Sequence, residues 1–140
     1  MPRYIAIALL VATACSLPFF TDWDESVGVV DGGMLAQGQA IQLDTVVSVG
    51  GTGRVSVITG GSGSCTRFGR TDVNWQSARV VVITPYNENL TTAQACTADF
   101  RFIPHQVSLQ YSQAGTYTVR IRAELSGSVQ QIAERFVRVQ

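Results

Sequence analysis

Lysine is absent from this chain of 140 residues, and its ten basic residues, all arginines, balance ten acidic residues to a formal charge of zero. A nucleic-acid surface needs a basic stripe, and this composition supplies none. A phosphate-binding loop ends in Gly-Lys-Ser or Gly-Lys-Thr, which the glycine-rich run from Gly60 to Ser64 lacks. We therefore expect no nucleic-acid partner, and we expect this run to connect two strands.

Histidine and cysteine are also scarce. His105 is the only histidine, and no two of the three cysteines form a Cys-x-x-Cys pair. Zinc needs three or four clustered ligands, and a general base needs a nucleophile and an orienting partner within hydrogen-bond reach. No nucleophile-elbow motif is present. The sequence predicts no metal, no cofactor and a surface position for His105, with an enzyme of unknown class kept as an alternative.

Long apolar runs are missing as well. An uncharged N-terminal run, Tyr4 to Ala14, would cover roughly 16 Å as a helix, about half of a ~30 Å hydrocarbon core. It follows Arg3 and ends in Ala12-Thr13-Ala14, and these are the features of a secretory signal. We expect residues 1–14 to be a cleavable signal peptide. The next residue, Cys15, implies attachment of lipid. Simple secretion of a soluble protein and an uncleaved anchor are the two alternatives to lipid attachment.

The segment from Leu10 to Cys15 resembles the lipobox of bacterial lipoproteins. The family usually has Leu where this chain has Ala12. The resemblance implies lipid on Cys15, attachment to a membrane of the cell envelope, and an anchor and tether over residues 15–25. The localisation alternative is a soluble periplasmic or secreted protein. Aromatic residues of the tether, Phe19, Phe20 and Trp23, are expected either to pack on the edge of the domain or to lie at the lipid interface.

Residues 26–140 show strand patterns and no sustained helical periodicity. Expected strands lie near residues 41–47, 54–59, 71–76, 79–84, 107–111, 117–124 and 132–139, with Gly50-Gly51 and Gly60-Gly61 as turns. In the last strand the apolar phase changes between Ile132 and Val137, which predicts a bulge or a two-sided strand. Seven or eight short strands predict a single all-β domain, a β-sandwich or barrel.

The segment from Tyr111 to Ile121 resembles the penultimate hairpin of bacterial immunoglobulin-like and polycystic-kidney-disease-type domains. The resemblance implies an immunoglobulin-like β-sandwich in which Gly115 makes the turn and Tyr117 enters the core. The wider region also resembles small exported bacterial proteins without an assigned activity, through the segments 64–71, 84–86 and 96–99, Pro104 and the expected strand that begins at Val107. Neither resemblance implies a chemical activity.

Cys65 and Cys96 are expected to form a disulfide, because thiols pair in the oxidising compartment that an exported protein reaches. The third cysteine of the chain, Cys15, is then the one left over, and lipid on it would remove the free thiol. The bridge would draw Arg67, Arg70 and Asp99 toward one another. They are expected to form either a ligand-binding rim for an anion or carboxylate, or an Arg–Asp pair that satisfies loop groups.

The favoured function is a non-catalytic envelope module, binding or structural, with an envelope protein or a glycan as partner. The alternative to it is an inhibitor- or chaperone-like module that uses a loop from Thr84 to Ala95.

Overall fold

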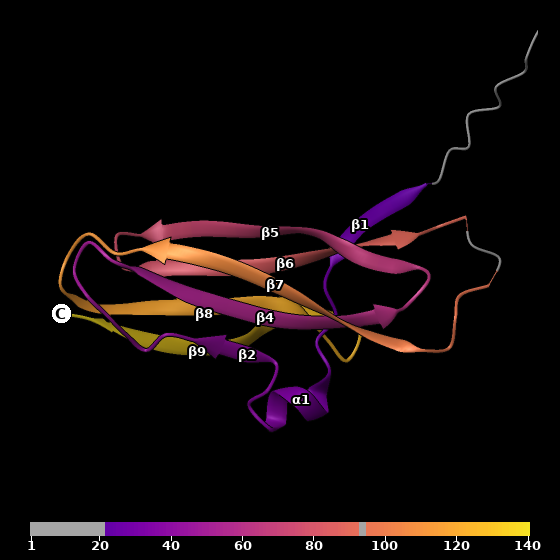
Figure 1. The fold of residues 1–140 in the computed structure, drawn as a ribbon, viewed down its shortest axis with the longest axis horizontal. Helices are drawn as coiled ribbons and strands as arrows, with labels where there is room; N and C mark the ends of the chain where they lie inside the picture. The colour runs from indigo at the N-terminus through magenta and orange to yellow at the C-terminus, as the bar shows by residue number, and fades with distance from the viewer. Residues whose placement is uncertain (1–21, 93–94) are drawn as a thin grey trace, which may run out of the picture.

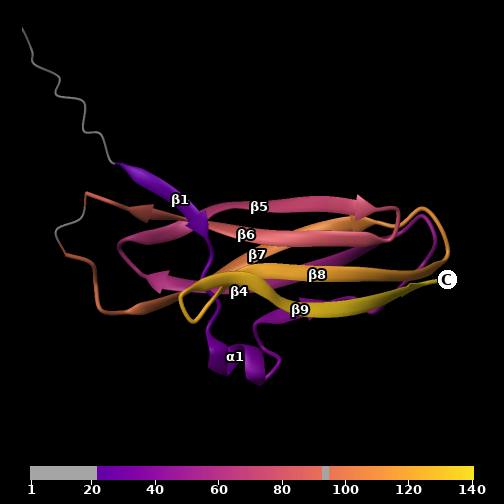
Figure 2. The ribbon, with the colours of Figure 1, turned by 180° about the vertical axis from the view of Figure 1, so that it is seen from behind.

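The computed structural model describes residues 22–92 and 95–140 of the chain, in two sheets (Figure 1, Figure 2). Cys15, Phe19, Phe20 and the predicted signal peptide lie outside the described residues. The elements are β1 (Trp23–Val27), α1 (Gly32–Ala36), β2 (Ile41–Leu43), β3 (Val46–Val47), β4 (Thr52–Ser62), β5 (Thr66–Ser77), β6 (Val80–Leu90), β7 (Phe100–Gln110), β8 (Gly115–Leu125) and β9 (Ser128–Val139). The prediction of an all-β, sandwich-like domain is confirmed.

The larger sheet has the order β1-β6-β8-β9-β3, with β5 on the other side of β6, and the smaller sheet has the order β2-β4-β7. Most pairs are antiparallel, but β6 pairs with β8 and β3 pairs with β9 in parallel. Immunoglobulin sandwiches are described by two antiparallel sheets, so these parallel pairs are a departure from that pattern. Within the described part of the chain, no helix is long and apolar enough to cross a bilayer.

The core follows from period-two patterns on the facing strands. In β8, Tyr117, Val119 and Ile121 are each at most 3% exposed, whereas Arg122 on the alternate face is exposed. Fully burying such a side chain contributes roughly 1.5–3 kcal/mol, so these three side chains together contribute roughly 5–9 kcal/mol. The strand β6 is central in the larger sheet, with β5 on one side and β8 with β1 on the other.

The predicted irregularity in the last strand is a β-bulge at Ile132. Ile121 lies opposite Ala133 and Arg122 lies opposite Gln131, so Ile132 is the extra residue of β9. The bulge changes the side-chain phase of the strand. It leaves Val137 buried and Phe136 exposed.

Gly60-Gly61 was expected to form a turn, and that prediction is wrong. Both glycines lie inside β4, and a Cβ at Gly60 would come within 2.0 Å of the Phe100 ring. A Cβ at Gly61 would meet the Thr66 side chain at 2.5 Å. The glycines are therefore needed because neighbouring side chains lie directly over the strand. The chain turns after Ser62 instead.

Two further expectations about segments need correction. Thr84 to Leu90 belongs to β6, so most of the loop proposed for an inhibitor-like contact is a strand held from both sides. Trp23 to Glu25, assigned to the tether, belongs to β1 and pairs with the end of β6. The helix α1 was not expected, because five residues are too few to show a periodicity; Asp31 caps it by accepting a hydrogen bond from the Met34 amide at 2.8 Å.

The free edge of β7 contains Pro104. The Ile58 amide of β4 donates to the Ala40 carbonyl, away from β7. Pro104 is the residue of β7 opposite Ile58, so its nitrogen also points away from the β4–β7 pair, toward the outer edge of β7. A proline there has no N–H to offer an incoming strand. This edge is therefore blunted against pairing with another chain.

Candidate functional site

His105 lies inside the sandwich, so the surface position expected from the sequence is wrong. The side chain is 1% exposed, and it projects from β7 into a polar layer formed with β4, β5 and β6. Its Nε2 lies 2.9 Å from Asn87 Oδ1 and 3.1 Å from Thr59 Oγ1, and its Nδ1 lies 3.1 Å from Thr71 Oγ1. Four strands thus converge on one imidazole.

One proton arrangement satisfies this layer. Asn87 Oδ1 accepts from the Thr59 hydroxyl at 3.0 Å and from Nε2–H of His105, and Nδ1 then accepts from the Thr71 hydroxyl. Desolvation by burial lowers the pKa of His105 to about 4, and a hydrogen bond from the ring to the Arg70 backbone opposes this shift. The imidazole is therefore neutral at pH 7. No buried side-chain nitrogen or oxygen lacks a partner in the described part of the chain.

Access to His105 is restricted by the residues around it. The Phe68 ring lies 4.9 Å from the imidazole, centroid to centroid, and Thr59 is 1% exposed. Across residues 22–92 and 95–140 no carboxylate hydrogen-bonds His105, and the side-chain oxygen of Asn87 orients its ring instead. The same residues hold no cluster of three or more His, Cys, Asp or Glu side chains suited to a metal ion.

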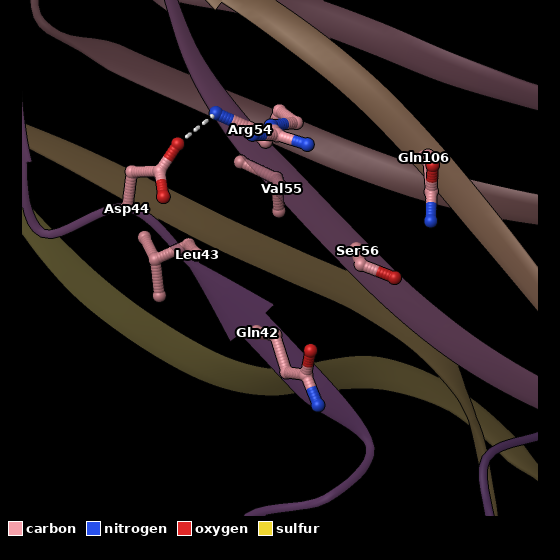
Figure 3. Close-up of a pocket in the computed structure, with 7 residues that line it drawn as sticks. All are labelled: Gln42, Leu43, Asp44, Arg54, Val55, Ser56 and Gln106. Carbon is pink, nitrogen blue, oxygen red and sulfur yellow. Dashed lines mark hydrogen bonds between the residues drawn. The ribbon is translucent and has the colours of Figure 1, made fainter.

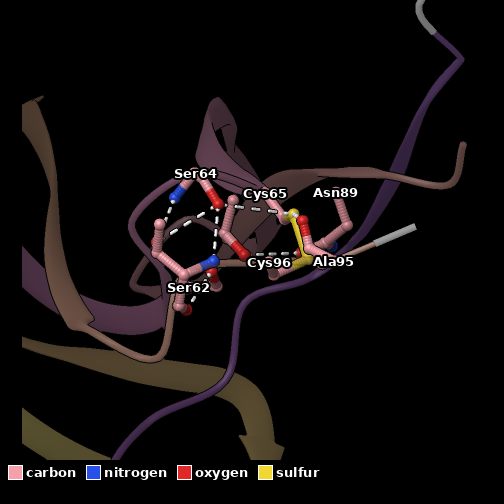
Figure 4. Close-up of a disulfide and its surroundings, with 8 residues drawn as sticks. Ser62, Ser64, Cys65, Asn89, Ala95 and Cys96 are labelled. Atoms are coloured by element: carbon pink, nitrogen blue, oxygen red, sulfur yellow. Dashed lines mark hydrogen bonds between the residues drawn. A yellow bond between two sulfur atoms is a disulfide. The ribbon is translucent and has the colours of Figure 1, made fainter. Parts of the chain in front are cut away.

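The disulfide between Cys65 and Cys96 is present, with a Cα–Cα distance of 5.5 Å, as expected from the sequence (Figure 4). It joins the turn after β4 to the segment that leads into β7. Hydrogen bonds reinforce the same contact: the Ser62 hydroxyl donates to the Thr97 carbonyl and the Thr97 amide donates to Ser64 Oγ, both at 2.8 Å. Cys65 is buried.

The two arginines of the expected rim, Arg67 and Arg70, contact residues of β1. Arg67 forms an ion pair with Glu88 and its guanidinium lies 4.0 Å above the Trp23 ring. Arg70 forms an ion pair with Glu25 at 3.0 Å. Arg70 also lies 4.0 Å above the Tyr86 ring and within 3.6 Å of Asp72. Both side chains therefore extend from β5 across β6 and hold β1 against the sheet.

Asp99, the third residue of the expected rim, is placed elsewhere. It lies against the turn after β4, where a Cβ at Gly63 would come within 2.0 Å of its carboxylate. Across residues 22–92 and 95–140 no ion pair joins Asp99 to Arg67 or Arg70. The structure thus brings the two arginines together and leaves Asp99 apart. Trp23 packs on the domain edge, one of the two positions considered for it.

A shallow hollow of about 360 Å³ lies on the outer face of the smaller sheet (Figure 3). Gln42, Ser56 and Gln106 form an in-register row across β2, β4 and β7. Beside this row, Asp44 Oδ2 accepts a hydrogen bond from the Arg54 amide at 2.8 Å. The hollow is polar, but its one carboxylate is already engaged by the backbone.

Thr59, Thr71 and Asn87 were not anticipated as partners of His105. The available signal was the phase of β7: Ile103, His105 and Leu109 share one face of the strand, and all three are buried.

Comparisons of the chain with protein-family models, with curated proteins and with solved structures give no match.

Proposed function

We propose that this chain is a lipid-anchored, non-catalytic binding module of the cell envelope. The leader and Cys15 support export and anchoring. An immunoglobulin-like character of the sandwich is supported by Tyr117 near the start of β8, whose hydroxyl donates to the Gln113 carbonyl at 3.1 Å. A tyrosine that bonds back to the preceding backbone at this point is a hallmark of immunoglobulin domains.

The observation that carries the non-catalytic part is the closed hydrogen-bond layer around His105. Both ring nitrogens are occupied by side chains of the domain, and Phe68 covers the ring. A general base must reach a substrate proton or a nucleophile that itself reaches substrate. Of the two hydroxyls that contact the imidazole, that of Thr59 is as buried as the histidine and that of Thr71 is partly buried and already donates to Nδ1. The layer is suited to specifying how the two sheets pack, a role known for buried polar groups in some proteins.

Anchoring is tested by Cys15→Ser in a Gram-negative host. The wild-type protein is expected in the detergent-soluble membrane fraction, and the variant in the soluble envelope fraction. Because a single acyl chain binds membranes only marginally, stable anchoring requires more than one chain on the mature protein. Ser16→Ala, at the neighbouring position, is the control and should stay in the membrane. Membrane association that survives Cys15→Ser would remove the lipid anchor from the proposal.

The non-catalytic assignment is tested by screening purified protein against fluorogenic ester, peptide and glycoside substrates. Hydrolysis should not exceed that of a His105→Ala sample. Turnover by the wild type that disappears in His105→Ala, with the circular dichroism spectrum preserved, would show that the histidine is a catalytic residue.

A further inference from the structure

A second hollow, of about 270 Å³, lies where β5 ends, where the chain turns into β6 and where β7 ends. Figure 1 shows the ends of β5 and β7 together at the far side of the molecule from β1. The hollow is lined by Trp75, Ser77, Ala78, Gln110, Ser112 and Tyr117. It therefore opens at the end of the sandwich opposite the N-terminal strand.

The indole of Trp75 forms a fixed wall of this hollow. Its ring meets Tyr111 and Tyr117 edge-on, at centroid distances of 6.5 and 6.2 Å, and these two tyrosines contact each other at 4.8 Å. Both tyrosines are at most 3% exposed, whereas Trp75 is 41% exposed. Edge-to-face packing on buried rings sets the orientation of the indole in advance, so a ligand would not have to order it.

The polar groups of the hollow are uncharged and available. Among residues 22–92 and 95–140, neither the Gln110 amide nor the Ser112 hydroxyl makes a side-chain hydrogen bond, and Ser77 Oγ accepts only a long one, 3.4 Å, from the Arg79 amide. The guanidinium of Arg79 is engaged by the Ala114 carbonyl at 3.1 Å. No residue lining the hollow carries a charge. Charged ligands would find no ion-pair partner here.

We propose that the Trp75 hollow binds a neutral saccharide. A pyranose ring offers an apolar C–H face to an indole and a rim of hydroxyls to amide and hydroxyl groups, which is the combination present. Ligand sites generally combine aromatic walls with a few placed polar groups. The inference rests on the proposed binding function and deepens it by naming the ligand class. The site would face away from a lipid-bearing N-terminus.

The test uses the full chain carrying Cys15→Ser, in solution, with Trp23→Phe so that Trp75 is the only indole. The probes are two neutral trisaccharides, tri-N-acetylglucosamine and maltotriose, titrated while Trp75 emission is recorded. Saturable quenching or a blue shift with at least one probe is expected. Gln110→Leu should weaken it about tenfold, the cost of one lost hydrogen bond of ~1.4 kcal/mol. Gln106→Leu, on the same face of β7 but in the other hollow, should leave it unchanged.

Two results would overturn the inference. One is unchanged Trp75 emission with both trisaccharides, and the other is equal weakening by Gln110→Leu and Gln106→Leu. The fractionation of Cys15→Ser does not depend on either result. Failure of saccharide binding is thus distinguishable from failure of the anchoring proposal.

Discussion

Lowering the pH should destabilise the fold through His105. Burial lowers its folded-state pKa to about 4, whereas an unfolded histidine titrates near 6.5. The unfolded chain therefore binds this proton first. Stability should be unaffected above pH 6.5 and should fall progressively as the pH decreases from 6.5 toward 4.

The size of the effect follows from the difference between the two pKa values. Each pKa unit corresponds to 1.36 kcal/mol, so the full loss is roughly 3 kcal/mol. Between pH 7 and pH 5 the loss is roughly 2 kcal/mol, because at pH 5 the unfolded histidine is almost fully protonated and the folded one is not. Against a domain stability of about 5–15 kcal/mol this is a large change.

The measurement is urea unfolding at several pH values for the wild type and for His105→Gln. Subtracting the two profiles cancels the carboxylates, which titrate in both proteins. The variant should be less stable at pH 7, because a glutamine cannot reproduce the hydrogen bonds of both ring nitrogens, but its pH profile should be flatter. As the only histidine, His105 also gives a single imidazole Cε1–H signal by NMR, which needs no assignment. A titration midpoint near 6.5, or parallel profiles for the two proteins, would refute the reasoning.

Three further changes test other features. Removing the bridge with Cys65→Ala and Cys96→Ala should cost roughly 3–4 kcal/mol for a closed loop of 31 residues, seen as a lower urea midpoint. Gly69→Ala should lower the free energy of unfolding by about 1–3 kcal/mol, because the added Cβ would meet the Tyr86 carbonyl oxygen at 2.8 Å. The control is Gly32→Ala, whose Cβ has its nearest neighbour at 3.7 Å and should be tolerated, and calorimetry compares the two variants. Arg70→Met should leave global stability nearly unchanged, because exposed ion pairs contribute little, but it should speed amide exchange in β1.

The strand pattern was predictable wherever side chains alternate between core and solvent. In β8 the alternation of Tyr117, Val119 and Ile121 with polar residues is local information, and it placed the strand in the core. The same reasoning could have placed His105, which is in phase with Ile103 and Leu109 on β7. It was expected at the surface because the sequence shows no nucleophile motif to accompany it, and this expectation took no account of the strand phase. The structure shows that Thr59, Thr71 and Asn87 satisfy it from three other strands.

The arrangement of the arginines could not be predicted, because their partners are distant in the sequence. Arg70 pairs with Glu25, a residue 45 positions earlier, through β6, which lies between their strands. Cysteine parity correctly identified the disulfide, but a bridge fixes only its own two residues. Asp99 is three residues from Cys96 and still lies away from both arginines. Sequence proximity to a bridge is therefore weak evidence for a shared site.

The two ends of the sandwich differ in how their residues are held. At the end where the chain enters, β1 is only five residues long, and ties to the neighbouring strands supplement its pairing with β6. Arg70 forms an ion pair with Glu25, and the side-chain amide of Asn89 donates to Ser26 Oγ at 2.8 Å. If Cys15 carries lipid, any pull on the anchor reaches the domain at β1, and these ties pass it to β5 and β6. The opposite end has no such load, and an exposed indole supported by buried tyrosines can serve there as a binding surface.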